Sequence, residues 1–144
     1  LRTAFDLLVD LYQVRYLVNI DSDTIHTTDW LMTLFRVYTE LNQELTDGPL
    51  VLSGFNAKTK KNIHRWKRYV EKDDLGGINL FFDTPTYMHY VRDTLIHVGW
   101  DIQLSKIIRQ QNGSLIALRN SVIQHIGAEG MWSGCGMYDH SSTF

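Results

Sequence analysis

The chain lacks the features that mark several large classes of protein. It has a single cysteine, Cys135, in 144 residues, which excludes an intrachain disulfide framework. It contains no run of eighteen apolar residues, so we expect no membrane-spanning segment. Neither sign of charge dominates, because the formal net charge is -2 and the isoelectric point is about 6.3. We therefore expect neither a general nucleic-acid binder nor a membrane-surface binder.

What is present is the composition of one globular domain. With 144 residues and 44% hydrophobic content, the chain is long enough to bury a real core, and it shows no internal repeat or low-complexity tract. The densest basic stretch, residues 58–72, mixes lysine and arginine with Trp66 and Tyr69. We expect it to be a solvated loop or helix rather than a phosphate-binding track.

Apolar segments alternate along the chain in a way that predicts helices and strands in turn. A helix over residues 1–11 leads directly into a strand over residues 17–20, so we interpret residues 1–144 as a single domain that is a fragment of something longer. That β-branched strand is expected to be buried on both faces. The remaining expected elements are a helix from Thr27 or Thr28 to 42, strands 50–52, 78–82, 115–118 and 122–125, helices 83–95 and 100–111, and a long loop 57–76.

The same pattern predicts which side of each helix is buried. The first helix is expected to bury Phe5, Leu8 and Leu11 or Tyr12; the second Leu31, Leu34, Phe35, Tyr38 and Leu41; and the last Ile102, Leu104, Ile107 and Ile108. Alternating strands and helices of this kind predict a layered α/β domain with a mixed sheet flanked by helices.

The acidic turn Asp21-Ser22-Asp23 ends the first strand. In open α/β sheets ligands collect at the carboxyl ends of strands, so acids placed there are candidates for ligand contact. Two carboxylates separated by one residue can supply oxygen ligands to a hard divalent cation, which in turn can hold phosphate oxygens. A solvated turn with a helix cap accounts for the same residues, and the motif alone leaves both interpretations open.

Three further features accompany this turn. Asp101 lies at the start of a helix, where the helix dipole favours an ionised carboxylate, although capping explains an aspartate there equally well. His125 ends an apolar strand. Its side chain is either a metal ligand or a hydrogen-bonded structural residue. The glycine-rich segment 127–136 contains Trp132, which could close over a flat ring, or the segment is an irregular tail.

In their order and spacing, these segments resemble the C-terminal two-thirds of a GT-A glycosyltransferase of the family 2 type. The acidic turn matches the DxD motif, residues 76–82 are similar to the strand after the acceptor loop, residues 99–101 to the catalytic-base segment, and His125 to the histidine of the metal site. Two departures are visible. The family's base usually lies in an acidic pair, whereas only Asp101 is acidic here, and the N-terminal nucleotide-binding βαβ portion is not in this sequence.

The resemblance implies metal-dependent transfer of a sugar from a nucleotide-diphosphate sugar to a hydroxyl of a glycan, lipid or protein acceptor, with no nucleic acid involved. It implies Mn²⁺ or Mg²⁺ at Asp23, His125 and Asp21, and Asp101 as the general base of an inverting displacement. The implied donor contacts are Asp21, Asp23, Trp132 and Ser133, and the implied sugar and acceptor contacts are Gly54, Phe55, Asn56, Gly76, Gly77 and Trp100.

Three other interpretations fit the same sequence. Some retaining GT-A families also combine an Asp-x-Asp turn with a late histidine followed by glycine and tryptophan, as His125, Gly127 and Trp132 are here. A non-catalytic carbohydrate- or metal-binding module would keep the acids as caps. A plain α/β domain of a structural protein would not need Asp21, Asp23 and His125 to lie near one another.

Overall fold

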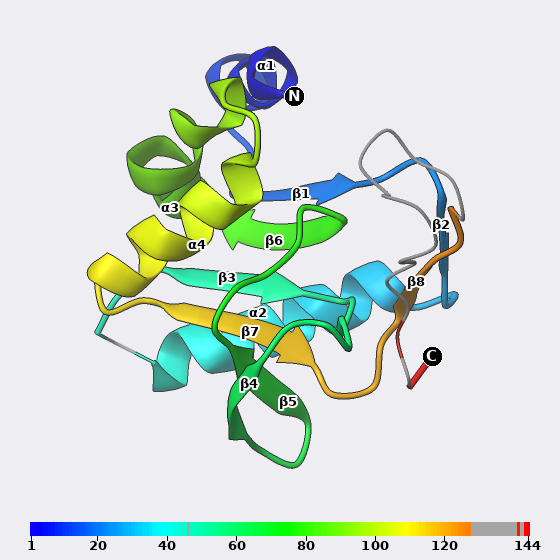
Figure 1. The fold of residues 1–144 in the computed structure, drawn as a ribbon. Helices are drawn as coiled ribbons and strands as arrows, with labels where there is room; N and C mark the ends of the chain where they lie inside the picture. The colour runs from blue at the N-terminus through cyan, green and yellow to red at the C-terminus, as the bar shows by residue number, and fades with distance from the viewer. Residues whose placement is uncertain (46, 128–140, 142) are drawn as a thin grey trace.

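The fold is organised around a mixed six-stranded sheet (Figure 1). The computed structural model describes residues 1–45, 47–127, 141 and 143–144. The strands lie in the order β1 (Tyr16–Ile20), β6 (Asn79–Asp83), β3 (Leu50–Ser53), β7 (Ser114–Leu118), β5 (Tyr69–Lys72) and β4 (Asn62–Arg65). Only β3 and β7 pair in parallel. A separate two-stranded sheet joins β2 (Thr24–His26) to β8 (Ile123–His125).

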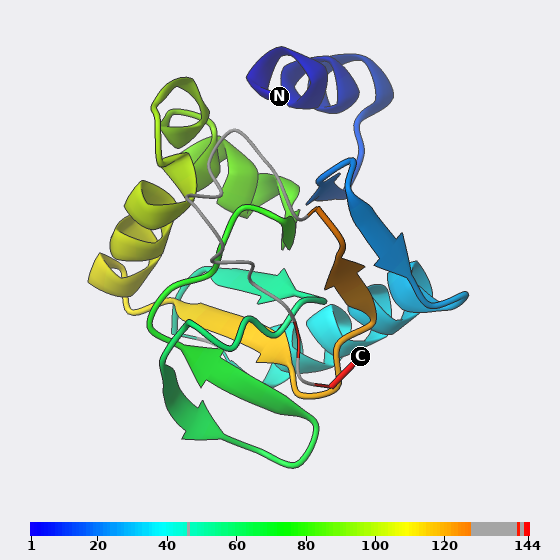
Figure 2. The ribbon, with the colours of Figure 1, turned by 45° about the vertical axis from the view of Figure 1, so that its right-hand side comes forward.

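Helices cover both faces of the large sheet, which confirms the expected α/β class (Figures 1 and 2). On one face lie α1 (Arg2–Tyr12), α3 (Thr84–Thr86), the π-helical turn η1 (Tyr87–Val91), the 3-10 turn η2 (Thr94–Ile96) and α4 (Trp100–Gln110). On the other face lies α2 (Trp30–Glu44). No helix in the described part of the chain is long and apolar enough to span a membrane.

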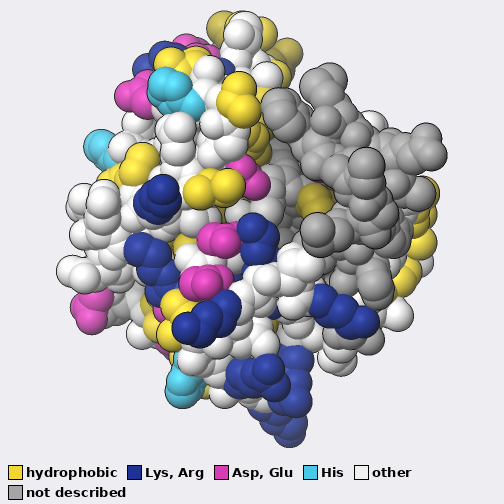
Figure 3. Space-filling model, in the orientation of Figure 1, with side chains coloured by type: hydrophobic (Ala, Val, Ile, Leu, Met, Phe, Trp, Pro, Cys, Tyr) yellow, Lys and Arg dark blue, Asp and Glu magenta, His cyan; other side chains and the backbone are white. Residues whose placement is uncertain are grey.

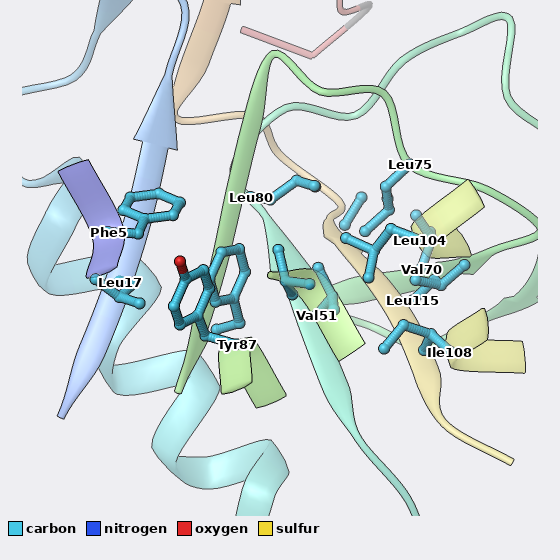
Figure 4. Packing of buried hydrophobic residues seen from close by; sticks show 13 residues of the cluster. Phe5, Leu17, Val51, Val70, Leu75, Leu80, Tyr87, Leu104, Ile108 and Leu115 are labelled. Carbon is cyan, nitrogen blue, oxygen red and sulfur yellow. The ribbon is translucent and has the colours of Figure 1, made fainter. Parts of the chain in front are cut away.

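The core follows the two-residue period of the central strands. In β3, Val51 faces the α4 side while Leu50 and Leu52 face α2, and all three are at most 2% exposed. The other central strands, β6 and β7, alternate in the same way. The cluster on the α4 side joins Phe5, Tyr87, Leu104 and Ile108 to the sheet (Figure 4).

The strand β1 corrects one expectation. It is an edge strand in which Leu17 and Asn19 are buried while Tyr16, Val18 and Ile20 are only half-buried. It is therefore not buried on both faces.

Helices form in the expected segments, except that the helix expected over 83–95 is divided into α3, η1 and the separate turn η2, and the predicted buried faces are partly wrong. In α1 only Phe5 is buried, whereas Leu11 and Tyr12 are 69% and 72% exposed, because this helix touches the sheet along a narrow line. The same correction applies to Leu8, Leu31, Phe35 and Ile102, which are exposed. The helix α2 begins at Trp30 with Asp29 as N-cap, because the preceding residues form β2, which the sequence pattern did not predict.

The segment 57–76 is not a loop but contains a β-hairpin, β4–β5, packed at the sheet edge beside β7. In β5, Val70 and Lys72 are buried, and the Nζ of Lys72 donates hydrogen bonds to the carbonyl oxygens of Ala57 (2.8 Å) and Lys60 (3.0 Å). Because a lysine takes a buried position and β4 is mostly exposed, the alternation that predicts strands is missing.

Candidate functional site

The acidic turn follows the last residue of β1 directly. The backbone N–H of Asp21 donates to the carbonyl of Ile78 (2.9 Å), just before β6 begins. The hydroxyl of Thr24 donates to the carbonyl of Asp21 (2.8 Å), which closes the turn. The pairing of β1 with β6 therefore fixes this turn beside residues 76–78.

The second sheet brings His125 to the acidic turn across 102 residues of sequence. Thr24 pairs with His125 in the β2–β8 ladder, and the N–H of Ile126 donates to the carbonyl of Asp23 (2.8 Å). As a result, Nε2 of His125 lies 3.0 Å from Oδ2 of Asp23. The imidazole is mostly covered, with 16% of its side chain exposed, and the carboxylate is more open at 41%.

Gly127 leaves no room for a side chain at this pair. A Cβ built on Gly127 would overlap Oδ2 of Asp23. A glycine at this position therefore lets the backbone approach the carboxylate that faces His125.

Asp101 is held in the first turn of α4 by the loop before β6. The helix starts after Gly99, which has a φ of 69° and so adopts the left-handed conformation that favours glycine. The N–H of Gly77 donates to Oδ2 of Asp101 (3.0 Å). A Cβ on Gly77 would lie 3.0 Å from the indole of Trp100, so this loop and the helix start are packed closely together.

Two buried asparagines connect these segments, and the sequence analysis did not identify either. Asn19 donates to the carbonyl of Gly77 (2.5 Å) and accepts from the N–H of Leu80 (3.0 Å). Asn79 donates to the carbonyl of Asn19 (3.0 Å) and accepts from the N–H of Gly54 (2.8 Å). An asparagine in the middle of an apolar strand, seen twice in one sequence, is the signal that could have found them.

Burial and neighbouring charges shift the pKa of Asp21. The pKa of its carboxyl is raised, first because burial removes water around it, and then because the negative charges of Asp23 and Asp101 disfavour its ionisation. His125 acts in the opposite direction and lowers the same pKa. Asp21 therefore lies within electrostatic range of Asp23, Asp101 and His125, although these residues come from three separate segments of the chain.

The pair formed by Asp23 and His125 fits a cation held by few protein ligands. Two ligand atoms about 2.1 Å from an ion and at right angles to each other lie about 3.0 Å apart. The observed separation of Nε2 and Oδ2 is 3.0 Å, which is that of a direct hydrogen bond between the two side chains and also matches this ligand spacing. No group of three or more histidine, cysteine or acidic residues able to hold a metal occurs among the described residues. Asp23 and His125 together therefore offer one carboxylate oxygen and one imidazole nitrogen as possible metal ligands.

The other predicted contact residues lie as follows. Gly54 is buried against Asn79, Phe55 lies in the core on the α2 side, and the side chain of Asn56 donates to the carbonyl of Arg119 (3.1 Å). Gly76 has open space around it. Trp132 and Ser133 fall outside the described residues. The roles assigned to these six residues stay predictions.

Comparison of the chain with protein-family models and with curated proteins found no match.

Proposed function

We propose that this chain is the metal- and acceptor-binding part of a GT-A type glycosyltransferase. The activity is transfer of a sugar from a nucleotide-diphosphate donor to an acceptor hydroxyl. The observation that carries the proposal is the convergence of the Asp21–Asp23 turn, His125 and Asp101 on one end of the sheet. A plain α/β domain has no need to bring these groups together.

Asp23 and His125 would hold the divalent cation, with Asp21 beside them or on the donor ribose. Imidazole favours transition metals and carboxylate favours harder ions, so the mixed pair suits Mn²⁺, with Mg²⁺ as the second choice. When bound, such an ion supplies positive charge for the diphosphate leaving group.

Asp101 would act as the general base. Its carboxylate lies in the first turn of α4 and accepts a hydrogen bond from the N–H of Gly77. As the acceptor oxygen bonds to the anomeric carbon, the bond from that carbon to the diphosphate oxygen breaks, and the acceptor proton passes to Asp101. Because the attack is a single displacement from the opposite face, the configuration of the product is inverted.

Water must be kept from the donor, because hydrolysis competes with transfer. The sequence predicts that segment 127–136 closes over the donor, but only Gly127 of it is among the described residues, so this stays a prediction. Residues 54–56 and Gly76-Gly77 would border the sugar and acceptor, next to Trp100.

The test is a transfer assay of the full-length protein with a panel of nucleotide sugars and Mn²⁺, followed by NMR of the product. Inversion at the anomeric carbon supports the assignment of Asp101 as base. Retention would support a retaining GT-A enzyme instead. Absence of both transfer and donor hydrolysis with every donor would favour a non-catalytic binding module.

A further inference from the structure

Positive charge is concentrated in one part of this acidic protein. Residues 48–70 contain six lysines and arginines and no aspartate or glutamate. The whole chain has 14 basic and 16 acidic residues. The rest of the sequence therefore contains eight basic and all 16 acidic residues, and its formal charge is -8. Dark blue side chains accordingly gather at the end of the molecule formed by β4 and β5 (Figure 3).

We define the basic hairpin as residues 58–68 together with Arg119. Arg119 belongs to it because its N–H donates to the carbonyl of Arg68 (3.0 Å) and its guanidinium donates to the carbonyl of Trp66 (3.5 Å). The turn is closed by the N–H of Trp66, which donates to the carbonyl of Tyr69 (2.9 Å). Lys67 and Arg68 therefore lie at the tip of an ordered hairpin.

Several of these cations are available to a ligand. Lys60 pairs with Asp74 (2.6 Å) and Arg68 with Glu40 (2.7 Å). Lys61, Arg65 and Lys67 are exposed and make no salt bridge within the described part of the protein. Their charges are thus not neutralised by the fold.

Protection of the sheet edge does not explain this charge pattern. The strand β4 is the last strand of the sheet, and charged side chains at an open edge prevent pairing with another chain. Lysine and arginine suit that purpose, but only Arg65 lies within β4, whereas Lys61, Lys67 and Arg68 lie outside the strand. Next to the cations, the rings of His64 and Trp66 (4.3 Å) and of Trp66 and Tyr69 (4.9 Å) form a small aromatic cluster.

We propose that the basic hairpin binds the carboxylate or sulfate groups of an anionic acceptor glycan. The patch covers one short hairpin, and the rest of the chain carries a formal charge of -8, which disfavours binding of a long polyanion or an anionic membrane. A short anionic oligosaccharide matches both its size and its charge, and the aromatic cluster offers a face on which a sugar ring can lie. This proposal rests on the glycosyltransferase function, because it names the acceptor class.

The basic hairpin acts at a distance from the reacting groups. β4 and β1 are the two opposite edges of the six-stranded sheet, and Asp21 directly follows β1. Five inter-strand spacings of about 4.8 Å separate these edges by roughly 24 Å. The basic hairpin would therefore hold a remote part of an extended acceptor, which changes KM rather than kcat when it improves binding equally in ground and transition states.

The experiment compares two triple variants with the same change in charge. The test variant is Lys61→Glu/Arg65→Glu/Lys67→Glu. The control is Arg15→Glu/Arg36→Glu/Lys106→Glu, which alters three exposed cations elsewhere. Calorimetric titration with a defined sulfated hexasaccharide, without donor, should show about tenfold or greater weakening in the test variant. The control should bind like the wild type, and unchanged thermal melting of both variants would show that the fold is intact.

The outcomes separate this proposal from the proposed function. Equal weakening in both variants, or tighter binding of a single-stranded oligonucleotide or of anionic lipid vesicles than of the hexasaccharide, overturns the glycan assignment. In the transfer assay, the test variant should raise KM for acidic acceptors and leave neutral acceptors unaffected. If the protein transfers sugar but the test variant changes no KM, the acceptor role of the basic hairpin is wrong while the glycosyltransferase function stands.

Discussion

Gly127 lies directly against the carboxylate of Asp23, so a methyl group on Gly127 would overlap the same oxygen that lies 3.0 Å from His125. The segment after β8 and the turn after β1 thus meet at a contact that a hydrogen atom fits and a methyl group does not. A side chain at residue 127 must shift the Asp23 carboxylate from its present position beside His125.

The first prediction follows from this contact. Gly127→Ala should weaken Mn²⁺ binding about 10–100-fold, the usual effect of disturbing the surroundings of metal ligands. Calorimetric titration with Mn²⁺ measures it. Gly76→Ala is the matched control, because a Cβ there meets no atom within 4 Å. Equal affinity in the two variants would show that the contact does not govern the metal site.

Asp101→Asn should abolish most of the transfer. The amide oxygen can still accept the hydrogen bond from Gly77, so the loop stays in place, but the amide cannot take a proton. We expect a rate loss on the order of 10²–10⁴ with unchanged donor affinity. Initial rates of sugar transfer and donor titrations check this. Asp93→Asn, at a side chain 91% exposed, is the control, and a near wild-type rate in Asp101→Asn would remove the base assignment.

Asn79→Ala should destabilise the protein by about 1–3 kcal/mol, since it leaves the N–H of Gly54 and the carbonyl of Asn19 without their partner. Urea unfolding followed by circular dichroism gives the free energy. Asn42→Ala, at an exposed position on α2, should cost much less. If both variants lose the same stability, the asparagine network is not a structural link between the segments of the site.

Protonation of Asp6 at low pH should reduce the stability of the packing of α1. The pKa of its carboxyl is lowered by hydrogen bonds from Arg92 (2.8 Å) and from the hydroxyl of Tyr87 (2.7 Å). A lowered pKa means that this stabilisation is complete above the unfolded value of about 3.8 and is lost as the pH falls through the folded pKa. Asp6→Asn should therefore cost about 1 kcal/mol at pH 7 and less at pH 2. Urea midpoints that show the same loss at both pH values would contradict this.

The sequence predicted the elements better than their contacts. The strands and helices that carry Asp21, Asp101 and His125 were expected because apolar periodicity and capping residues are local signals. The pairing of β2 with β8 was not, because it joins residues 102 positions apart and β2 is only three residues long. From the sequence, the proximity of Asp23 to His125 was therefore only a hypothesis, and the tertiary structure was needed to test it.

The missed features share a physical cause, which is that polar residues occupy buried positions. Asn19, Asn79 and Lys72 interrupt the apolar pattern of their strands, yet each is buried because its polar atoms are hydrogen-bonded. Local patterns weigh a residue by its hydrophobicity and not by the partners it will find. For this reason the sequence pattern did not predict the hairpin β4–β5.

The most direct test of the account is where Mn²⁺ binds. In two-dimensional NMR of the ¹⁵N-labelled protein, bound Mn²⁺ should broaden amide signals around Asp21–Thr24, Gly77, Asp101 and His125–Gly127 together, at sub-stoichiometric metal. Asp23→Ala and His125→Ala should each weaken this broadening. Broadening confined to other acidic groups, such as Asp73 and Asp74, or unchanged in both variants, would contradict a shared metal site.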